Sequence, residues 1–143
     1  MIGRVVGLDY GDRRVGVAVS DAMRVVSTPV LTLSHNGWKQ LWEPLKKLEA
    51  EYDPSSWVVG LPLHMDGGEG DRAERTHVFV AAFKEHTDRE IVLWDERLST
   101  AEARRAMDEV GVKQDRRKEL VDQLAAQLIL QSWLDAQVPP LEF

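Results

Sequence analysis

The first third of the chain alternates apolar and polar residues in the manner of β-strands. Residues 4–9 and residues 14–20 are rich in valine, and in the second segment the valines recur at every second position. Gly11 and Asp12 lie between the two segments, and a connection this short predicts an antiparallel hairpin. A third strand is expected at residues 30–33.

Beyond residue 33 the apolar spacing alternates between that of a helix and that of a buried strand. The expected elements are, in chain order, a helix carrying Trp38, Leu41, Leu45 and Leu48, a strand at 57–61, a helix carrying Thr76, Phe79 and Phe83, a strand at 91–94, a helix from the Ser99–Glu102 capping box to Gly111, and a helix at about 118–137. Pro44 is expected to kink or shorten the first helix. The pattern predicts an α/β fold in which a five-stranded mixed sheet, antiparallel in its first three strands and joined behind by parallel crossovers, is flanked by helices.

Length and composition bound the class of protein. The 143 residues predict a single domain, 1–143, and the lack of cysteine excludes disulfides, thiolate metal sites and cysteine nucleophiles. The 24 acidic residues outnumber the 18 Lys and Arg, and the net charge of −6 argues against a general electrostatic coat for nucleic acid while permitting a local basic patch or a bound metal. With no apolar run of ~20 residues and no signal-peptide pattern at the start, we expect a cytoplasmic protein without a membrane partner.

Carboxylates occur where two predicted strands end. Asp9 ends an apolar strand, where it either caps the turn or faces a partner. Asp95 and Glu96 follow the strand at 91–94, and Arg97 can neutralise either of them. Because neighbouring strand residues point to opposite faces, at most one of this pair shares a face with a given partner.

Asp122 lies within an apolar arc of the last predicted helix. On a helical wheel Gln123, Gln127 and Gln131 form a polar stripe, and Asp122 falls nearly opposite, among alanine, isoleucine and tryptophan side chains. Desolvating a lone carboxylate costs several kcal/mol, so Asp122 requires either an arginine partner or a metal.

Carboxylates at two strand ends and on the terminal helix can converge on a hard cation. Mg²⁺ and Mn²⁺ prefer oxygen ligands, and two such ions about 4 Å apart activate water and stabilise the leaving oxygen of a phosphodiester. The histidines show no zinc-ligand spacing, and each is expected at the surface or in a loop: His35, His64, His77 and His86.

Two further features bear on phosphate binding. The Gly-rich loop at 66–70 either presents backbone N–H groups to a phosphate or simply turns the chain. Lys113, Arg116, Arg117 and Lys118 form a basic cluster, which either holds a phosphate backbone or is the solvated start of a helix.

Four blocks of sequence together resemble the YqgF (RuvX) family, bacterial RNase H-fold proteins described as pre-16S rRNA nucleases and Holliday junction resolvases. In order along nearly the whole chain, the blocks are GLDYG with RVGVAVSD (7–11 and 14–21), VGLPL with MDG (59–63 and 65–67), DERLST with EA (95–100 and 102–103), and DQLAA with ILQ (122–126 and 129–131). The chain departs from the family pattern at Asp12 and Arg13, where Thr or Lys is common, and at His64, where Asn is common.

The resemblance implies an RNase H-like fold and assigns roles to acidic residues. It implies that Asp9, Glu96 and Asp122 are the catalytic, metal-binding carboxylates for Mg²⁺ or Mn²⁺. It selects Glu96 over Asp95, which stays a supporting residue. The residues expected to position phosphates are Arg14, Arg72, Arg75, Lys113, Arg116, Arg117 and Lys118.

The leading hypothesis is a divalent-metal-dependent endonuclease acting on structured nucleic acid. The expected reaction is 5′-end processing of pre-16S rRNA, and the alternative is Holliday junction resolution on branched DNA. In a different class, an actin-like nucleotide-binding module has a similar phosphate-binding hairpin, but such proteins need two domains and an adenosine pocket. A catalytically inactive ribosome-biogenesis factor is a further hypothesis, which the complete set of acids argues against. The expected partner is nucleic acid, bound by a monomer or a homodimer.

Overall fold

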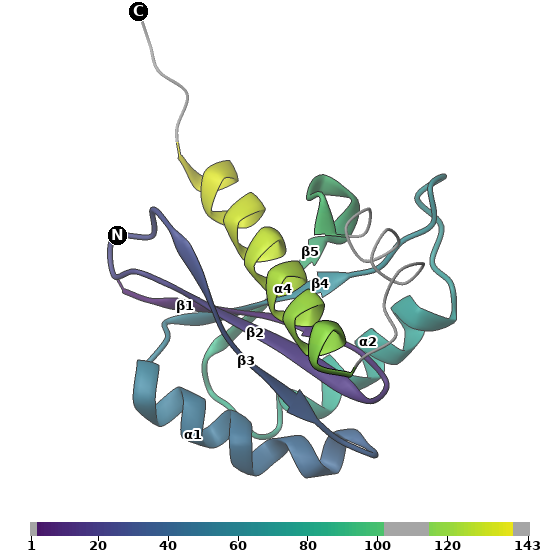
Figure 1. Ribbon diagram of the computed structural model, residues 1–143, viewed down its shortest axis with the longest axis horizontal. Helices are drawn as coiled ribbons and strands as arrows, with labels where there is room; N and C mark the ends of the chain where they lie inside the picture. The colour runs from purple at the N-terminus through teal and green to yellow at the C-terminus, as the bar shows by residue number, and fades with distance from the viewer. Residues whose placement is uncertain (1–2, 102–114, 139–143) are drawn as a thin grey trace, which may run out of the picture.

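The computed structural model describes residues 3–101 and 115–138 (Figure 1). In chain order its elements are β1 (Val5–Tyr10), β2 (Arg14–Ser20), β3 (Ser27–Ser34), the 3₁₀ turn η1 (Trp38–Leu41), α1 (Trp42–Tyr52), β4 (Ser56–Leu61), α2 (Asp71–Phe83), β5 (Glu90–Asp95), the 3₁₀ turn η2 (Glu96–Leu98) and α4 (Asp115–Gln137). Within the described residues, no helix is long and apolar enough to cross a bilayer.

The five strands form one mixed sheet in the order β3-β2-β1-β4-β5. β1 pairs antiparallel with β2, and β2 pairs antiparallel with β3. β4 pairs parallel with β1 on one side and with β5 on the other. The predicted five-stranded mixed sheet, with an antiparallel front and parallel crossovers, is therefore confirmed.

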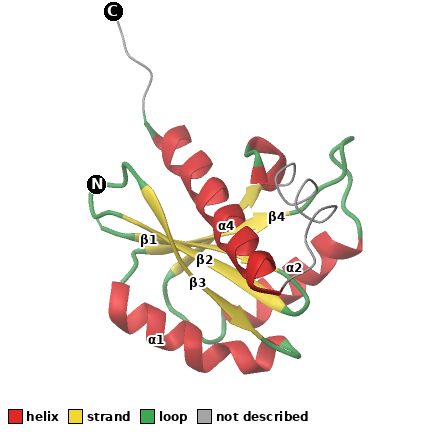
Figure 2. Ribbon diagram, viewed as in Figure 1, coloured by secondary structure: helices red, strands yellow, loops and turns green. Residues whose placement is uncertain are grey.

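Helices cover both faces of the sheet, in the three-layer arrangement that buries both sides of its strands (Figure 2). On one face, α1 and α2 pack against a cluster that contains Val6, Leu8 and Trp57. On the other face, α4 crosses the sheet diagonally and packs through Ile129 and Leu130 (Figure 1). Alternate residues of each strand therefore lie in different cores.

Glycines in the sheet allow α4 to lie close to it. A Cβ atom on Gly7 would lie 2.8 Å from the Leu130 Cβ, and one on Gly60 would lie 2.6 Å from the Ile129 Cδ1. Real Cβ atoms do not approach other atoms this closely, so the helix can occupy this position at Gly7 only because that residue lacks a side chain, whereas at Gly60 the tip of Ile129 would have to move. Packing against α4 therefore constrains which residue types these strand positions can hold.

The largest differences from the predicted bounds are in β3 and in the helix that contains Pro44. β3 begins at Ser27, before the predicted residue 30, because Ser27 pairs with Ser20 of β2; Ser27 also donates its backbone N–H to Gln131 Oε1 (2.9 Å) and its hydroxyl to the Gln127 carbonyl (2.8 Å) on α4. The glutamine stripe of α4 therefore binds an edge strand. The helix expected to carry Trp38, Leu41, Leu45 and Leu48 is divided into η1 and the shorter α1, and Pro44 falls in the first turn of α1, where a backbone N–H is not needed.

The helix expected from Ser99 to Gly111 lies, beyond Ala101, outside the described residues. The Ser99 hydroxyl accepts a hydrogen bond from the Ala101 N–H at 3.2 Å, as an N-cap residue does.

Candidate functional site

Asp9 and Glu96 lie where β1 and β5 end, on the face of the sheet that α4 covers. In β1, Val5 and Gly7 face α4, so Asp9 faces it by alternation. In β5 the α4-facing residue is Trp94, and Glu96 is two residues further along the chain. Both carboxylate residues are buried, Asp9 with 5% of its surface exposed and Glu96 with 1%. Two acids that strand alternation places on one face are thus withdrawn from water.

Asp95 belongs to the opposite face and has a partner of its own. Its neighbours Ile91 and Leu93 pack in the core under α1 and α2. Its carboxylate caps η2 by accepting the Arg97 backbone N–H at 2.9 Å, and it pairs with the Arg97 guanidinium at 2.7 Å. The hydrogen bond from Arg97 holds the pKa of Asp95 below its usual value. The structure therefore separates Asp95 from Glu96, which sequence reasoning could do only through the family resemblance.

The helix α4 brings Asp122 to the strand next to Asp9. Gly16 of β2 is the register partner of Asp9, and a Cβ on Gly16 would lie 1.9 Å from the Asp122 carbonyl oxygen. The backbone of Asp122 thus rests directly on Gly16. Asp9, Glu96 and Asp122 all belong to the layer between the sheet and α4, and they come from three segments far apart in sequence.

The carboxylate of Asp122 pairs with Arg14. The Arg14 Nε lies 2.6 Å from Asp122 Oδ2, and the two side chains are 35% and 14% exposed, respectively. Of the two partners expected for this acid, the structure provides the arginine. In the part of the chain that the structure describes, no three His, Asp or Glu side chains are grouped so as to hold a metal ion.

The basic residues expected to bind phosphate divide between the two faces. Arg72 and Arg75 lie on α2, beneath the sheet, and line a small cavity of about 60 Å³ with the β1–β2 turn. Arg75 pairs there with Asp12 at 2.9 Å. Burial, and secondarily the charge of Asp12, raise the pKa of Tyr10 in the same cavity.

Arg117 and Lys118 are exposed in the first turns of α4. Lys113 and the side chain of Arg116 lie outside the described residues.

His35 lies in the loop that follows β3, within the expected surface or loop positions, but it is buried. His35 is 5% exposed, stacks on Tyr10 at 5.6 Å, and accepts the Gly37 N–H on Nδ1. Its Nε2 therefore carries the proton and donates to the Gly11 carbonyl at 2.7 Å. The ring ties the hairpin turn to the end of β3, a structural role that sequence spacing does not reveal.

Sequence reasoning missed Arg13 and Gln40 as candidate site residues. Both line a pocket beside Arg14, and Gln40 comes from the 3₁₀ turn that follows β3. The only signal in the sequence was the departure of Arg13 from the family pattern in the turn.

Comparison with known proteins gives consistent results over nearly the whole chain. A family model described as "RuvX: Holliday junction resolvase" matches residues 3–136. A protein of Myxococcus xanthus with the provisional name pre-16S rRNA nuclease is 42% identical over 137 residues, which cover 96% of this chain and 91% of the relative. A protein of Rhodobacter capsulatus with the same provisional name is 44% identical over 134 residues, covering 94% of this chain and 84% of the relative.

Solved structures share the fold at low sequence identity. RuvC of Thermus thermophilus, in complex with a Holliday junction substrate, has a TM-score of 0.57 and 14% identity, covering 94% of this chain and 96% of that one. The yeast mitochondrial Holliday junction resolvase has a TM-score of 0.56 and 10% identity, covering 93% of this chain and 78% of that one. These likenesses confirm the RNase H-like fold, and the family match with the relatives above 40% identity establishes that the chain belongs to the RuvX family.

Proposed function

We propose that this protein is a divalent-metal-dependent nuclease that hydrolyses phosphodiester bonds in pre-16S rRNA. The observation that carries the proposal is the pair of buried carboxylate residues, Asp9 and Glu96, on the α4 face of the sheet, with Asp122 on the helix above it. The names of the relatives from Myxococcus xanthus and Rhodobacter capsulatus support the choice of substrate.

The chemistry of the three acids suits a hard divalent cation, although the described structure does not group them as a ready-made metal site. Asp9, Glu96 and Asp122 offer only carboxylate oxygens, which Mg²⁺ and Mn²⁺ prefer over nitrogen or sulfur. Asp9 and Glu96, 5% and 1% exposed, place two carboxylates on one face of the sheet and out of bulk water, and buried carboxylates are paired or coordinate a metal. We assign these three residues as the ligands.

In this proposal Asp9 and Glu96 hold the cation, and Asp122 completes the set from α4. A bound divalent cation supplies a polarised water for attack on phosphorus and stabilises charge on the leaving oxygen. Arg14, which is paired with Asp122 at 2.6 Å, keeps that carboxylate neutralised when no cation is bound and carries a guanidinium suited to phosphate. Arg72 and Arg75 would position phosphates from the α2 side of the hairpin turn.

The first prediction is metal dependence. Because the proposed ligands are all carboxylates, Mg²⁺ and Mn²⁺ are expected to support cleavage, and Ca²⁺, which takes a looser and larger coordination shell, is expected to support it poorly. The measurement is cleavage of a labelled pre-16S rRNA fragment in each metal and in EDTA, together with thermal unfolding, in which Mn²⁺ should raise the Tm of the protein. Full activity in EDTA would contradict the proposal.

The second prediction concerns the exposed basic residues at the start of α4. Replacing Arg117 and Lys118 together by alanine is expected to weaken RNA binding and to flatten its salt dependence, because each lost phosphate contact lowers the log–log slope by roughly 0.7 to 0.9. Binding at several salt concentrations measures this slope, and the Tm increase caused by Mn²⁺ should be unchanged. An unaltered slope would mean that Arg117 and Lys118 are solvated surface residues that do not contact phosphate.

Branched DNA is the second candidate substrate, and the description of the matching family model favours it. Parallel cleavage assays on a four-way DNA junction and on a pre-16S rRNA fragment, at equal concentration and in the same metal, discriminate the two. Faster cleavage of the junction, with no cleavage at the pre-16S 5′ end, would replace the rRNA assignment.

A simpler measurement distinguishes the nuclease hypothesis from the hypothesis of a nucleotide-binding module. Thermal unfolding with ATP and with Mn²⁺ is expected to show stabilisation by Mn²⁺ alone, because the proposed site consists of acids that bind a cation. Stabilisation by ATP without metal would favour the nucleotide-binding hypothesis.

A further inference from the structure

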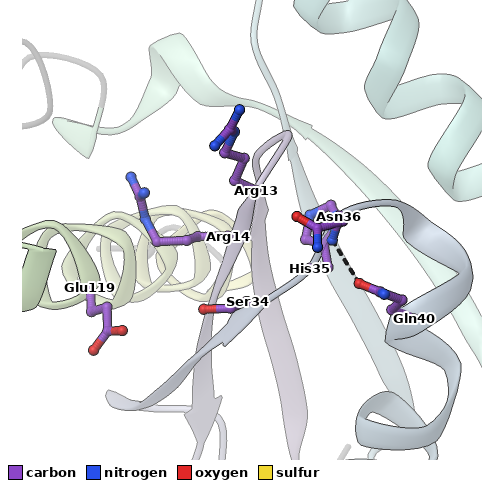
Figure 3. Close-up of a pocket in the computed structure, with 7 residues that line it drawn as sticks. All are labelled: Arg13, Arg14, Ser34, His35, Asn36, Gln40 and Glu119. Atoms are coloured by element: carbon purple, nitrogen blue, oxygen red, sulfur yellow. Dashed lines mark hydrogen bonds between the residues drawn. The ribbon is translucent and has the colours of Figure 1, made fainter.

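A polar pocket of about 390 Å³ lies beside Arg14 (Figure 3). We call it the Arg13 pocket, and it is lined by Arg13, Arg14, Ser34, His35, Asn36, Gln40 and Glu119. Its walls come from the β1–β2 hairpin, the end of β3, the η1 turn and the first turns of α4. Every lining side chain can donate or accept a hydrogen bond, so the pocket suits a polar ligand.

Arg13 and Gln40 supply hydrogen-bond donors to the pocket. Among the described residues, the exposed guanidinium of Arg13 makes no ion pair, while its backbone carbonyl accepts the His35 N–H at 2.8 Å and fixes the turn. Gln40 accepts the Asn36 N–H through Oε1 at 2.7 Å, which makes its Nε2 group the available donor. A guanidinium and an amide in one pocket favour an anionic group such as a phosphate.

Glu119 supplies an acceptor from another wall of the pocket. Figure 3 shows Glu119 projecting from α4 on the side of the pocket away from Gln40, with Ser34 between the two. A carboxylate repels a phosphate but accepts hydrogen bonds from hydroxyl and exocyclic amino groups. A nucleotide carries both kinds of group, with an anionic phosphate at one end and donors on its sugar or base at the other.

Arg14 connects the pocket to the candidate metal site. It lines the pocket and also pairs with Asp122 at 2.6 Å. Along β2, Arg14 lies two residues from Gly16, the register partner of Asp9, which corresponds to roughly 7 Å along the strand. A nucleic-acid strand with one phosphate at the acids therefore needs to extend by only about one nucleotide to enter the pocket.

We propose that the Arg13 pocket binds the nucleotide next to the scissile phosphate, with its phosphate on Arg13 and its sugar or base donors on Glu119. This inference rests on the proposed nuclease function and names a subsite for its substrate. It gives this chain a substrate-positioning arginine in the turn, at a position where its sequence departs from the family pattern.

The test measures binding of a short fluorescent single-stranded RNA by anisotropy, with Ca²⁺ present so that cleavage is slow. Arg13→Ala is expected to weaken binding about tenfold and to lower the salt slope by about 0.7, the values for one charge-assisted phosphate contact on a single strand. The matched control is Arg4→Ala, which removes the same charge from an exposed residue before β1, at the other end of that strand. Arg4→Ala should bind like the wild type.

A second pair of variants separates direct contact from long-range charge. Gln40→Glu keeps an acceptor for the Asn36 N–H but replaces the amide donor by a carboxylate, so RNA binding should weaken about tenfold. Gln137→Glu makes the same charge change near the C-terminal end of α4 and should bind normally. Unchanged Tm values for the four variants confirm that the fold is retained.

The outcomes distinguish failure of this inference from failure of the proposed function. Equal weakening by Arg13→Ala and Arg4→Ala, or normal binding by Arg13→Ala and Gln40→Glu, would overturn the pocket while wild-type cleavage still supports the nuclease. If the wild type binds RNA through Arg13 and Gln40 but does not cleave it in any divalent metal, the proposed nuclease function is overturned and the pocket is retained. A wild type that neither binds nor cleaves nucleic acid would overturn both.

Discussion

Glu96→Gln is expected to reduce cleavage by at least about 100-fold, because loss of a metal ligand costs more than the 10- to 100-fold loss typical of outer-shell partners. The substitution preserves the shape of a side chain that is 1% exposed, so the free energy of unfolding should stay within about 1 kcal/mol of the wild type. Initial rates of pre-16S rRNA cleavage in Mn²⁺, with urea denaturation in EDTA, measure both quantities.

Asp95→Asn is the matched control, since it makes the same chemical change one residue earlier, on the other face of the sheet. This variant should retain most of the activity and should still be stabilised by Mn²⁺, whereas Glu96→Gln should lose that stabilisation. If Asp95→Asn abolishes cleavage and Glu96→Gln does not, the assignment of the ligand by sheet face is wrong.

We expect Asp95 to make the free energy of unfolding depend on pH and to have little effect on cleavage. Its pKa is lowered in the folded state by the hydrogen bond from Arg97, so the stabilisation is present above the unfolded pKa of about 3.9 and is lost as the pH falls through the folded value. Because the pair is partly exposed to water, the loss in Asp95→Asn at neutral pH should be no more than about 1 kcal/mol. The difference from the wild type should vanish in acid.

Asp122→Asn is expected to abolish cleavage in Mn²⁺ while destabilising the metal-free protein by about 1 kcal/mol or less. The variant loses its negative charge opposite Arg14, but the Arg14 side chain is 35% exposed and can be hydrated, so little stability is lost. Neutralising Asp122 also removes a like charge from the face that carries Asp9 and Glu96, which offsets part of the loss. Urea denaturation in EDTA and a cleavage assay in Mn²⁺ test the two halves of the prediction.

The control on the same helix is Asp135→Asn, an exposed acid near the end of α4 that should change neither measurement. A double-mutant cycle between Arg14→Gln and Asp122→Asn measures the coupling of the pair, expected at about 1 kcal/mol or less. A loss of 3 kcal/mol or more in Asp122→Asn would assign the acid to a structural ion pair, as expected for a stranded buried cation. A stable variant that still cleaves would remove Asp122 from the site.

Local sequence pattern determined most of the elements of this protein. Valine alternation and a short turn with Gly11 predicted the β1–β2 hairpin, and an apolar run bounded by Pro62 predicted β4. These features depend on neighbours within a few residues, because side chains alternate along a strand and recur every three to four positions on a helix. The position of Asp122 within an apolar arc of its helix, and therefore its need for a partner, could be predicted from the sequence for the same reason.

Only the tertiary structure decided which side chains meet. Arg14 and Asp122 are separated by 108 positions in sequence, and their contact depends on α4 crossing the sheet directly above Gly16. The same crossing brings Gln127 and Gln131 onto the start of β3, and the end of β3 brings Gln40 beside Arg13. Periodicity specifies which face of an element is apolar but not which element covers it, so the partner of Asp122, the burial of His35 and the Arg13 pocket follow from packing alone.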